Sequence, residues 1–207
     1  MKIVIGGSYH NPNWQEVKRV REKLQRAGLE ILMPIYDEPI DINKDFVRFP
    51  GDEDELEHII EQNFRDLVDG IADAFVIVNS GGYIGRTTLE ECLEAVFMNL
   101  TLRRRFLIYF TEEPIIFKEI EKGVESPIVF PSGKRMKFAG PDELRERLGL
   151  NISQEEYDKL YPLHCKLYEI FNNYPGVCNI GIDELLESVD VKELPSIPGT
   201  GNGRRIF

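Results

Sequence analysis

The stretch ADAFVIVNSGGYIGRTTLEECLEA, residues 72 to 95, contains the pattern that decides the fold. It opens with an apolar run, which is typical of a strand whose two faces are both covered in a parallel sheet. A glycine-rich turn follows, and residues 87–100 then show the apolar spacing of a helix. A strand, a turn and a helix in this order form one half of a βαβ unit.

The same alternation runs through the first half of the chain. Strand patterns occur at residues 2–7, 29–34 and 105–110, and helical patterns occur at residues 12–28 and 53–72. Alternating strands and helices predict an α/β fold, here a Rossmann-like or flavodoxin-like doubly wound parallel sheet of about five strands. The segment SPIVF, residues 126–130, is the possible fifth strand.

The composition changes near residue 150. We predict an α/β domain over residues 1–150, and a helical extension with a flexible tail over residues 151–207. Residues 154–174 carry an aromatic and aliphatic stripe, which we expect to pack on the domain or on a second subunit. The tail contains Gly-Thr-Gly-Asn-Gly, but no strand pattern precedes these glycines, so they do not predict a phosphate site.

Charge and composition exclude several classes of function. A formal net charge of -11 disfavours binding to a nucleic acid polymer. No apolar run approaches the length of about 18 residues that a membrane helix needs, so we expect no membrane partner. Three cysteines without a C-x-x-C pair predict reduced thiols and a cytoplasmic protein. The three histidines show no metal-ligand spacing, and we predict no metal site.

Two glycine-bearing loops follow predicted strands, at residues 6–13 and 79–88. In a flavodoxin-like strand order the two strands are neighbours at the point where the order reverses, and ligands bind there. The loops are therefore expected to line one cleft. Residues 36–52 form a long connection with little periodicity, which is a candidate lid or binding loop.

Glu90 and Glu91 at the start of the third helix have two interpretations. Both fit a capping box, as Thr87-x-x-Glu90 and Thr88-x-x-Glu91. Alternatively, Glu91 lies above small and apolar side chains at the mouth of the cleft, where it is partly desolvated and reactive. The glycines of the preceding turn favour the second interpretation, because they allow close approach of a ligand and a cap does not need them.

The quoted stretch resembles the nucleoside 2-deoxyribosyltransferase-like proteins. The shared features are an aspartate-led strand, a Gly-Tyr-Ile-Gly loop, and the spacing of Thr88, Glu91 and Ala95. The opening MKIVIGGS and the segment GLEILMP also fit, so that the resemblance covers roughly residues 1–110. The chain departs from the family at Leu93, where many members have glycine, and at TLRRR, where many have a compact GKP turn.

The resemblance implies cleavage of an N-glycosidic bond or deoxyribosyl transfer, with Glu91 as the nucleophile and no cofactor. It also implies an aspartate near the leaving base, for which we select Asp66 over Asp69. Further substrate contacts are implied for two groups of residues: Gly6, Gly7, Ser8, Tyr9 and Phe46 from the first half of the domain, and Gly82, Tyr83, Gly85 and Thr88 around the glycine turn. The expected partner is a nucleoside or nucleotide, and a homo-oligomer is consistent with the family.

Two alternatives remain. The same stretch resembles cytokinin-activating phosphoribohydrolases, which release a base from a nucleoside 5′-monophosphate, but their earlier glycine-rich motif is replaced here by ILMPIYDE. The second alternative is a non-catalytic nucleotide-binding or sensing module on the same fold. In that case Glu91 would hold ribose hydroxyls without turnover.

Overall fold

The structure is a computed structural model, and it describes residues 1–7, 14–33, 64, 70–102, 106–117, 128–140, 153–174 and 176–190. None of the helices in these ranges is long and apolar enough to cross a membrane.

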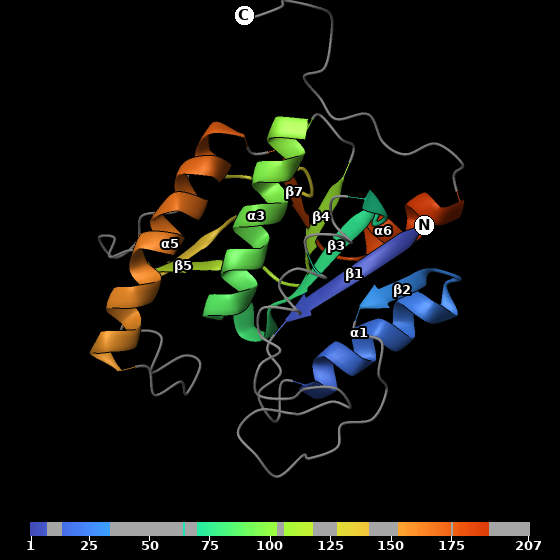
Figure 1. The fold of residues 1–207 in the computed structure, drawn as a ribbon, viewed down its shortest axis with the longest axis horizontal. Helices are drawn as coiled ribbons and strands as arrows, with labels where there is room; N and C mark the ends of the chain where they lie inside the picture. The colour runs from blue at the N-terminus through green and yellow to red at the C-terminus, as the bar shows by residue number, and fades with distance from the viewer. Residues whose placement is uncertain are drawn as a thin grey trace, which may run out of the picture.

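A parallel sheet of five strands forms the centre of the molecule, in the order β2-β1-β3-β4-β7 (Figure 1). This arrangement confirms the predicted doubly wound, flavodoxin-like fold. The order reverses at β1, which lies between β2 and β3. The strands are β1 (Lys2–Gly7), β2 (Glu30–Met33), β3 (Ala74–Val78), β4 (Leu107–Phe110) and β7 (Cys178–Ile180).

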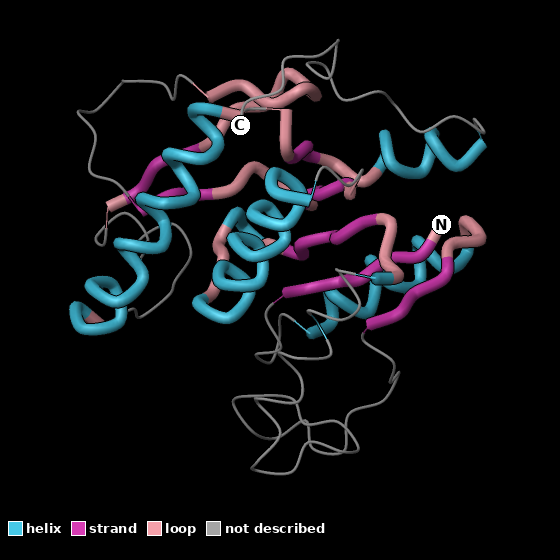
Figure 2. Tube along the Cα trace, turned by 45° about the horizontal axis from the view of Figure 1, so that its top comes forward, coloured by secondary structure: helices cyan, strands magenta, loops and turns pink. Residues whose placement is uncertain are grey.

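Helices cover both faces of the sheet because its central strands are apolar on both sides. On one face, Phe75 and Ile77 of β3 pack in a cluster with side chains from α3 (Arg86–Leu102) and α5 (Gln154–Asn173). On the other face, alternate residues such as Val76 pack with α1 (Trp14–Arg26) and α6 (Asp183–Asp190). The α3 and α5 helices lie side by side in both overall views (Figures 1 and 2).

A second, two-stranded parallel sheet lies beside the main one. It pairs β5 (Ile115–Phe117) with β6 (Lys137–Ala139), and α5 packs against it. Ser153 caps α5, since its hydroxyl oxygen accepts a hydrogen bond of 3.2 Å from the backbone N–H of Glu156. This sheet carries side chains that meet the glycine turn after β3.

The predicted fifth strand at residues 126–130 is wrong. Within that segment Val129 makes an isolated antiparallel bridge to Arg135, and the fifth strand of the main sheet is β7, which pairs with β4. Leu167 and Phe171 of α5 also belong to the core cluster that contains β3 and β4. The C-terminal part is therefore more than a helical extension, because it completes the sheet and shares its core. The three residues of β7 were too short a run to predict a strand.

The predicted helix at residues 53–72 falls mostly outside the described residues. Phe64 is described, and its ring meets that of Phe75 edge-on, with 5.2 Å between centroids. The aspartate at the start of the third strand, Asp73, joins the amino ends of two strands: its carboxylate accepts a hydrogen bond of 2.7 Å from the Lys2 backbone N–H. This contact lies at the end of the sheet opposite the loops that were expected to bind a ligand.

His164 of α5 is completely buried, and its ring stacks on Phe117 with 4.0 Å between centroids. Neither ring nitrogen has a hydrogen-bond partner among the described residues. Burial lowers the pKa of His164 from 6.5 to about 3, because the charged form cannot be solvated there. The folded chain thus holds this histidine neutral, while the unfolded chain protonates it below pH 6.5.

This difference predicts that the protein loses stability in mild acid. Since the folded-state pKa is the lower one, the contribution of His164 is fully present above pH 6.5 and decreases as the pH falls towards 3. Between pH 7.5 and 5.5 this loss is about 1.4 kcal/mol. We expect His164→Phe to remove it, as measured by urea unfolding at both values. An equal loss in the variant would assign the acid sensitivity to other groups.

Candidate functional site

The candidate site lies where β1 and β3 end side by side. The two strands pair in register, with Gly6 opposite Ile77 and Gly7 opposite Val78. Because the strand order reverses at β1, the described helices that follow the two strands cover opposite faces of the sheet, α1 one face and α3 the other. The α3 helix follows β3 through the turn η1 (Ser80–Gly82), which brings the start of α3 to this edge of the sheet.

The beginning of α3 excludes both capping boxes. The helix starts at Arg86, and the N–H of Leu89 donates to the carbonyl of Gly85 over 2.9 Å, which makes Gly85 the N-cap residue. Thr87 and Thr88 are therefore already inside the first turn. A capping-box glutamate lies three residues after the cap, whereas Glu90 and Glu91 lie five and six residues after it. Neither glutamate therefore belongs to a capping box of this helix.

Glu91 lies over the end of β1. It is half-buried, and its helix face also carries Thr88 and Ala95, which are both buried. A Cβ atom placed on Gly6 would lie 3.1 Å from Oε2 of Glu91 and 2.6 Å from Cζ of Phe75. The missing side chain at Gly6 therefore makes the space that the carboxylate and the Phe75 ring share. The structure brings together two residues that the sequence placed in one site, Gly6 and Glu91.

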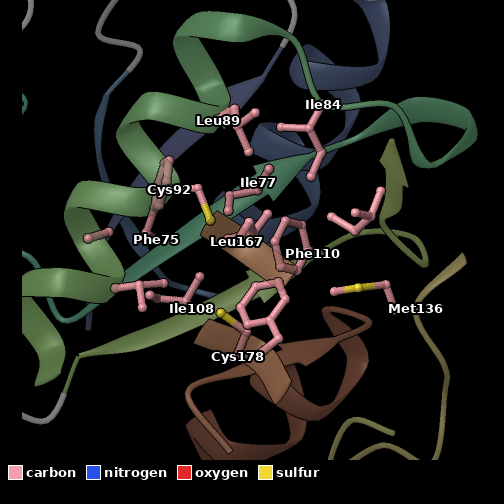
Figure 3. Close-up of a cluster of buried hydrophobic side chains, with 14 of the residues drawn as sticks. Phe75, Ile77, Ile84, Leu89, Cys92, Ile108, Phe110, Met136, Leu167 and Cys178 are labelled. Atoms are coloured by element: carbon pink, nitrogen blue, oxygen red, sulfur yellow. The ribbon is translucent and has the colours of Figure 1, made fainter. Parts of the chain in front are cut away.

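The neighbouring glutamate has a different environment. Glu90 accepts a hydrogen bond of 3.0 Å from Nε of Arg86 in an exposed ion pair one helical turn apart. On the inner side of the helix, burial raises the pKa of the Cys92 thiol, and the negative charge of Glu91 raises it further. Cys92 remains a protonated core residue, and Figure 3 shows it among the apolar side chains of the cluster between α3 and the sheet. Of Glu90, Glu91 and Cys92, we select Glu91 as the candidate reactive group.

A pocket of about 540 Å³ opens beside Glu91. Its volume lies within the range of roughly 300–1,000 Å³ that is typical of small-molecule sites. Its wall combines carboxylates with apolar side chains, and none of the described residues that line it is basic. The lining residues are Phe64, Thr87, Glu90, Glu91, Leu93, Glu94 and Phe97.

The glycine turn after β3 is held against the second sheet. The side chain of the buried Asn79 accepts hydrogen bonds from the Thr111 hydroxyl and the Glu112 N–H, and it donates to the Glu112 carbonyl. Gly82 has φ +86°, and a Cβ atom there would lie 2.5 Å from the Glu113 carbonyl oxygen. These contacts explain why glycine is needed at position 82 without a ligand.

Tyr83, like Gly82, packs against β5 of the second sheet. Its ring stacks on Phe117 with 6.2 Å between centroids, and burial, assisted by the negative charge of Glu156, raises its pKa to about 12. The phenol therefore stays protonated at neutral pH. The turn thus connects the main sheet to β5 and α5, while Gly6 and Glu91 meet at the end of β1.

Of the remaining predicted site residues, the structure describes Gly7, Gly85 and Thr88. Gly7 faces α1, since a Cβ atom there would lie 3.0 Å from Cγ2 of Val17. Gly85 and Thr88 belong to the first turn of α3, as described above. Four of the predicted residues, Ser8, Tyr9, Phe46 and Asp66, lie outside the described residues.

Sequence reasoning missed several residues of the pocket wall. From the sequence we expect Leu89, Leu93, Val96 and Leu100 to form the core stripe of this helix, and Phe97 falls outside that stripe. In the structure Leu89 and Val96 are buried together with Cys92 and Ala95, whereas Leu100 is exposed and Phe97 is exposed beside the pocket. The sequence did indicate an exposed apolar residue on this helix, since α3 carries more apolar residues than one helix face can hold. In the described part of the chain, no group of three or more His, Cys, Asp or Glu side chains is arranged to hold a metal ion.

Comparison with known proteins gives no further constraint: no family model, no curated protein and no solved structure matches this chain. We therefore infer the function from the site itself.

The packing of Gly82 predicts a large loss of stability on substitution. Gly82→Ala places a Cβ atom 2.5 Å from the Glu113 carbonyl and keeps an unfavourable positive φ. Gly28→Ala is the matched control, because Gly28 has φ +83° and nothing within 4 Å of the added atom. We expect Gly28→Ala to cost about 1–2 kcal/mol of unfolding free energy. Gly82→Ala should cost roughly 1–3 kcal/mol more, from the forced backbone shift.

Urea unfolding of both variants measures this difference. Equal losses would mean that the turn moves away from Glu113 without cost.

Proposed function

We propose that this protein cleaves the N-glycosidic bond of a nucleoside, or transfers its deoxyribosyl group to a second base, with Glu91 as the nucleophile. The observation that carries the proposal is the position of the Glu91 carboxylate. It lies over Gly6 at the point where the strand order reverses, beside a pocket of about 540 Å³. A capping role, which was the competing explanation, does not fit the start of α3 at Arg86.

The chemistry of glycosyl transfer needs a carboxylate in such a position. As the bond to the base breaks, the sugar develops positive charge in an oxocarbenium-like transition state. An ionised carboxylate stabilises that charge and then bonds to the anomeric carbon, which gives a covalent glycosyl-enzyme intermediate. Water or a second base then displaces Glu91. Because Gly6 has no side chain, nothing from that residue blocks the approach of the sugar to Oε2.

The leaving base must receive a proton or a hydrogen bond as it departs. Asp66 stays the predicted donor on the basis of family resemblance. Asp66 lies outside the described residues, whereas Phe64 lines the pocket. The ring of Phe64 also offers an apolar surface on which a base can pack.

The charge of the pocket favours an uncharged nucleoside over a 5′-monophosphate. Three carboxylates line it, from Glu90, Glu91 and Glu94; they outnumber the Arg86 guanidinium that pairs with Glu90, so the wall disfavours a phosphate dianion. The carboxylate of Glu91 also favours the positive charge that develops on the sugar. This supports glycosyl transfer from nucleosides more strongly than the phosphoribohydrolase alternative.

Substitution of Glu91 tests the proposal. We expect Glu91→Gln to lower base release on the order of 10³-fold or more, because an amide cannot act as the nucleophile or balance the positive charge. Glu90→Gln is the matched control on the adjacent residue, whose carboxylate is half-exposed and paired with Arg86. It should retain activity within about threefold, a change worth less than 1 kcal/mol. The measurement is chromatographic detection of free base from a panel of nucleosides and 5′-nucleotides, with and without a second base.

Two outcomes would contradict the proposal. Base release that persists in Glu91→Gln would remove Glu91 from the mechanism. Saturable nucleotide binding with no free base after long incubation would instead identify a non-catalytic sensing module.

A further inference from the structure

A stack of aromatic rings joins α5 to the second sheet. Tyr157 and His164 both stack on Phe117 of β5, with 5.2 Å and 4.0 Å between ring centroids and interplanar angles of 7° and 17°. Tyr83 of the glycine turn stacks on the same ring. We call these four residues the Phe117 stack. Three segments far apart in the sequence meet there: the glycine turn, β5, and α5, which lies beside β5 in Figure 1.

His164 is the member of this stack whose polar groups are unsatisfied. It is completely buried, and neither ring nitrogen has a partner within hydrogen-bond distance in the described part of the chain. A neutral imidazole has one N–H donor, and the protonated form has two. Protonation in place would therefore bury a positive charge and two donors that have no acceptor, which is strongly unfavourable. The ring can accept a proton only when it leaves the stack.

The helix that carries His164 is weakened two residues before it. Pro162 lies inside α5 and has no backbone N–H, so the carbonyl of Asp158 lacks its usual helical donor. Beyond this point α5 is anchored to the main core, because Phe171 meets the rings of Phe110 and Phe130 edge-on, with 5.9 Å and 5.4 Å between centroids. The part of α5 before Pro162 can therefore separate from the second sheet while the later part stays on the main core.

The other titratable groups around His164 do not change charge in mild acid. Residues 115–117 of β5 include none, and those described in the stack or in the core cluster beside α5 are phenols and thiols: Tyr83, Tyr157, Cys92 and Cys178. Phenols and thiols ordinarily titrate above pH 8, and burial raises the pKa of Tyr83 and of both thiols further. The charges of Glu156 and Glu91 act on Tyr83 and Cys92, whereas burial alone lowers the pKa of His164 from 6.5 to about 3.

We propose that protonation of His164 opens the Phe117 stack, so that residues 154–162 separate from the second sheet while the main sheet stays folded. Because the closed form has the lower pKa, it is favoured above pH 6.5 and loses stability relative to the open form as the pH falls towards 3. In the open form the glycine turn loses the contact of Tyr83 with Phe117, which makes the segment that leads into α3 sensitive to acid. This inference does not depend on the reaction proposed for Glu91.

Native-state hydrogen exchange of the full chain, followed by mass spectrometry at pH 7.5 and 5.5, tests this opening. After correction for the chemical exchange rates, the protection of residues 80–84, 115–117 and 154–162 should fall about tenfold at the lower pH. At both pH values these segments should exchange at least about tenfold faster than β1 and β3. Their exchange should also respond little to urea below the unfolding transition, whereas β1 and β3 exchange through global unfolding, which urea promotes strongly.

Variants of His164 identify the group that titrates. His164→Phe removes the imidazole and should abolish the tenfold change, so that protection at pH 5.5 equals protection at pH 7.5. His164→Leu is a second variant without a titrating ring, and it should behave in the same way if the phenyl ring disturbs the packing. Tyr161→Phe is the matched control, because Tyr161 is a half-exposed residue of the same helix and this variant keeps His164. It should retain the full tenfold change.

Three results would overturn the proposal. The first is equal protection of the three segments at pH 7.5 and 5.5 in the unmodified chain. The second is a tenfold change that persists in both variants of His164, which would assign the acid sensitivity to another group. The third is equal protection and equal urea dependence of these segments and of β1 and β3, since the stack would then open only when the whole chain unfolds.

Discussion

The candidate site depends on the pairing of β1 with β3. These strands lie next to each other although α1 and β2 separate them in sequence, and β2 pairs with the other edge of β1. The reversal places α1 and α3, the described helices that follow β1 and β3, on opposite faces of the sheet. Since α3 follows β3 directly, its first turns lie over the end of β1, and Glu91 meets Gly6 there. With a different strand order, this contact between Gly6 and Glu91 would not form.

Two sets of glycines at this edge serve different purposes. Gly6 leaves room for a ring and a carboxylate that come from other elements. The glycines of the turn after β3 instead let the backbone bend and approach the Glu113 carbonyl, while Asn79 bonds to the loop after β4. The turn thus fixes the position of α3 relative to the second sheet. Its contribution to the site is indirect, through the placement of the helix that carries Glu91.

The pocket beside Glu91 unites polar and apolar features that suit the proposed reaction. Its carboxylates favour a ligand that carries or develops positive charge, and its apolar wall is provided by Phe64, Leu93 and Phe97. A nucleoside that passes through an oxocarbenium-like state satisfies these conditions during the reaction.

The sequence by itself determined the fold class and the positions of β1, β3 and α3, because these features depend on local periodicity and on glycines at the ends of strands. The selection of Glu91 as nucleophile came from the family resemblance and stays a prediction. It did not determine β7, since three residues give no periodic signal and their place is fixed by pairing with β4. It left the capping interpretation open, which the Leu89 to Gly85 hydrogen bond decided against. Tertiary structure alone decided three features: the contact between Gly6 and Glu91, the packing of Tyr83 on Phe117, and the exposure of Phe97. Each joins residues far apart in the chain or depends on which face of a helix the sheet covers, and neither property is encoded in a local pattern.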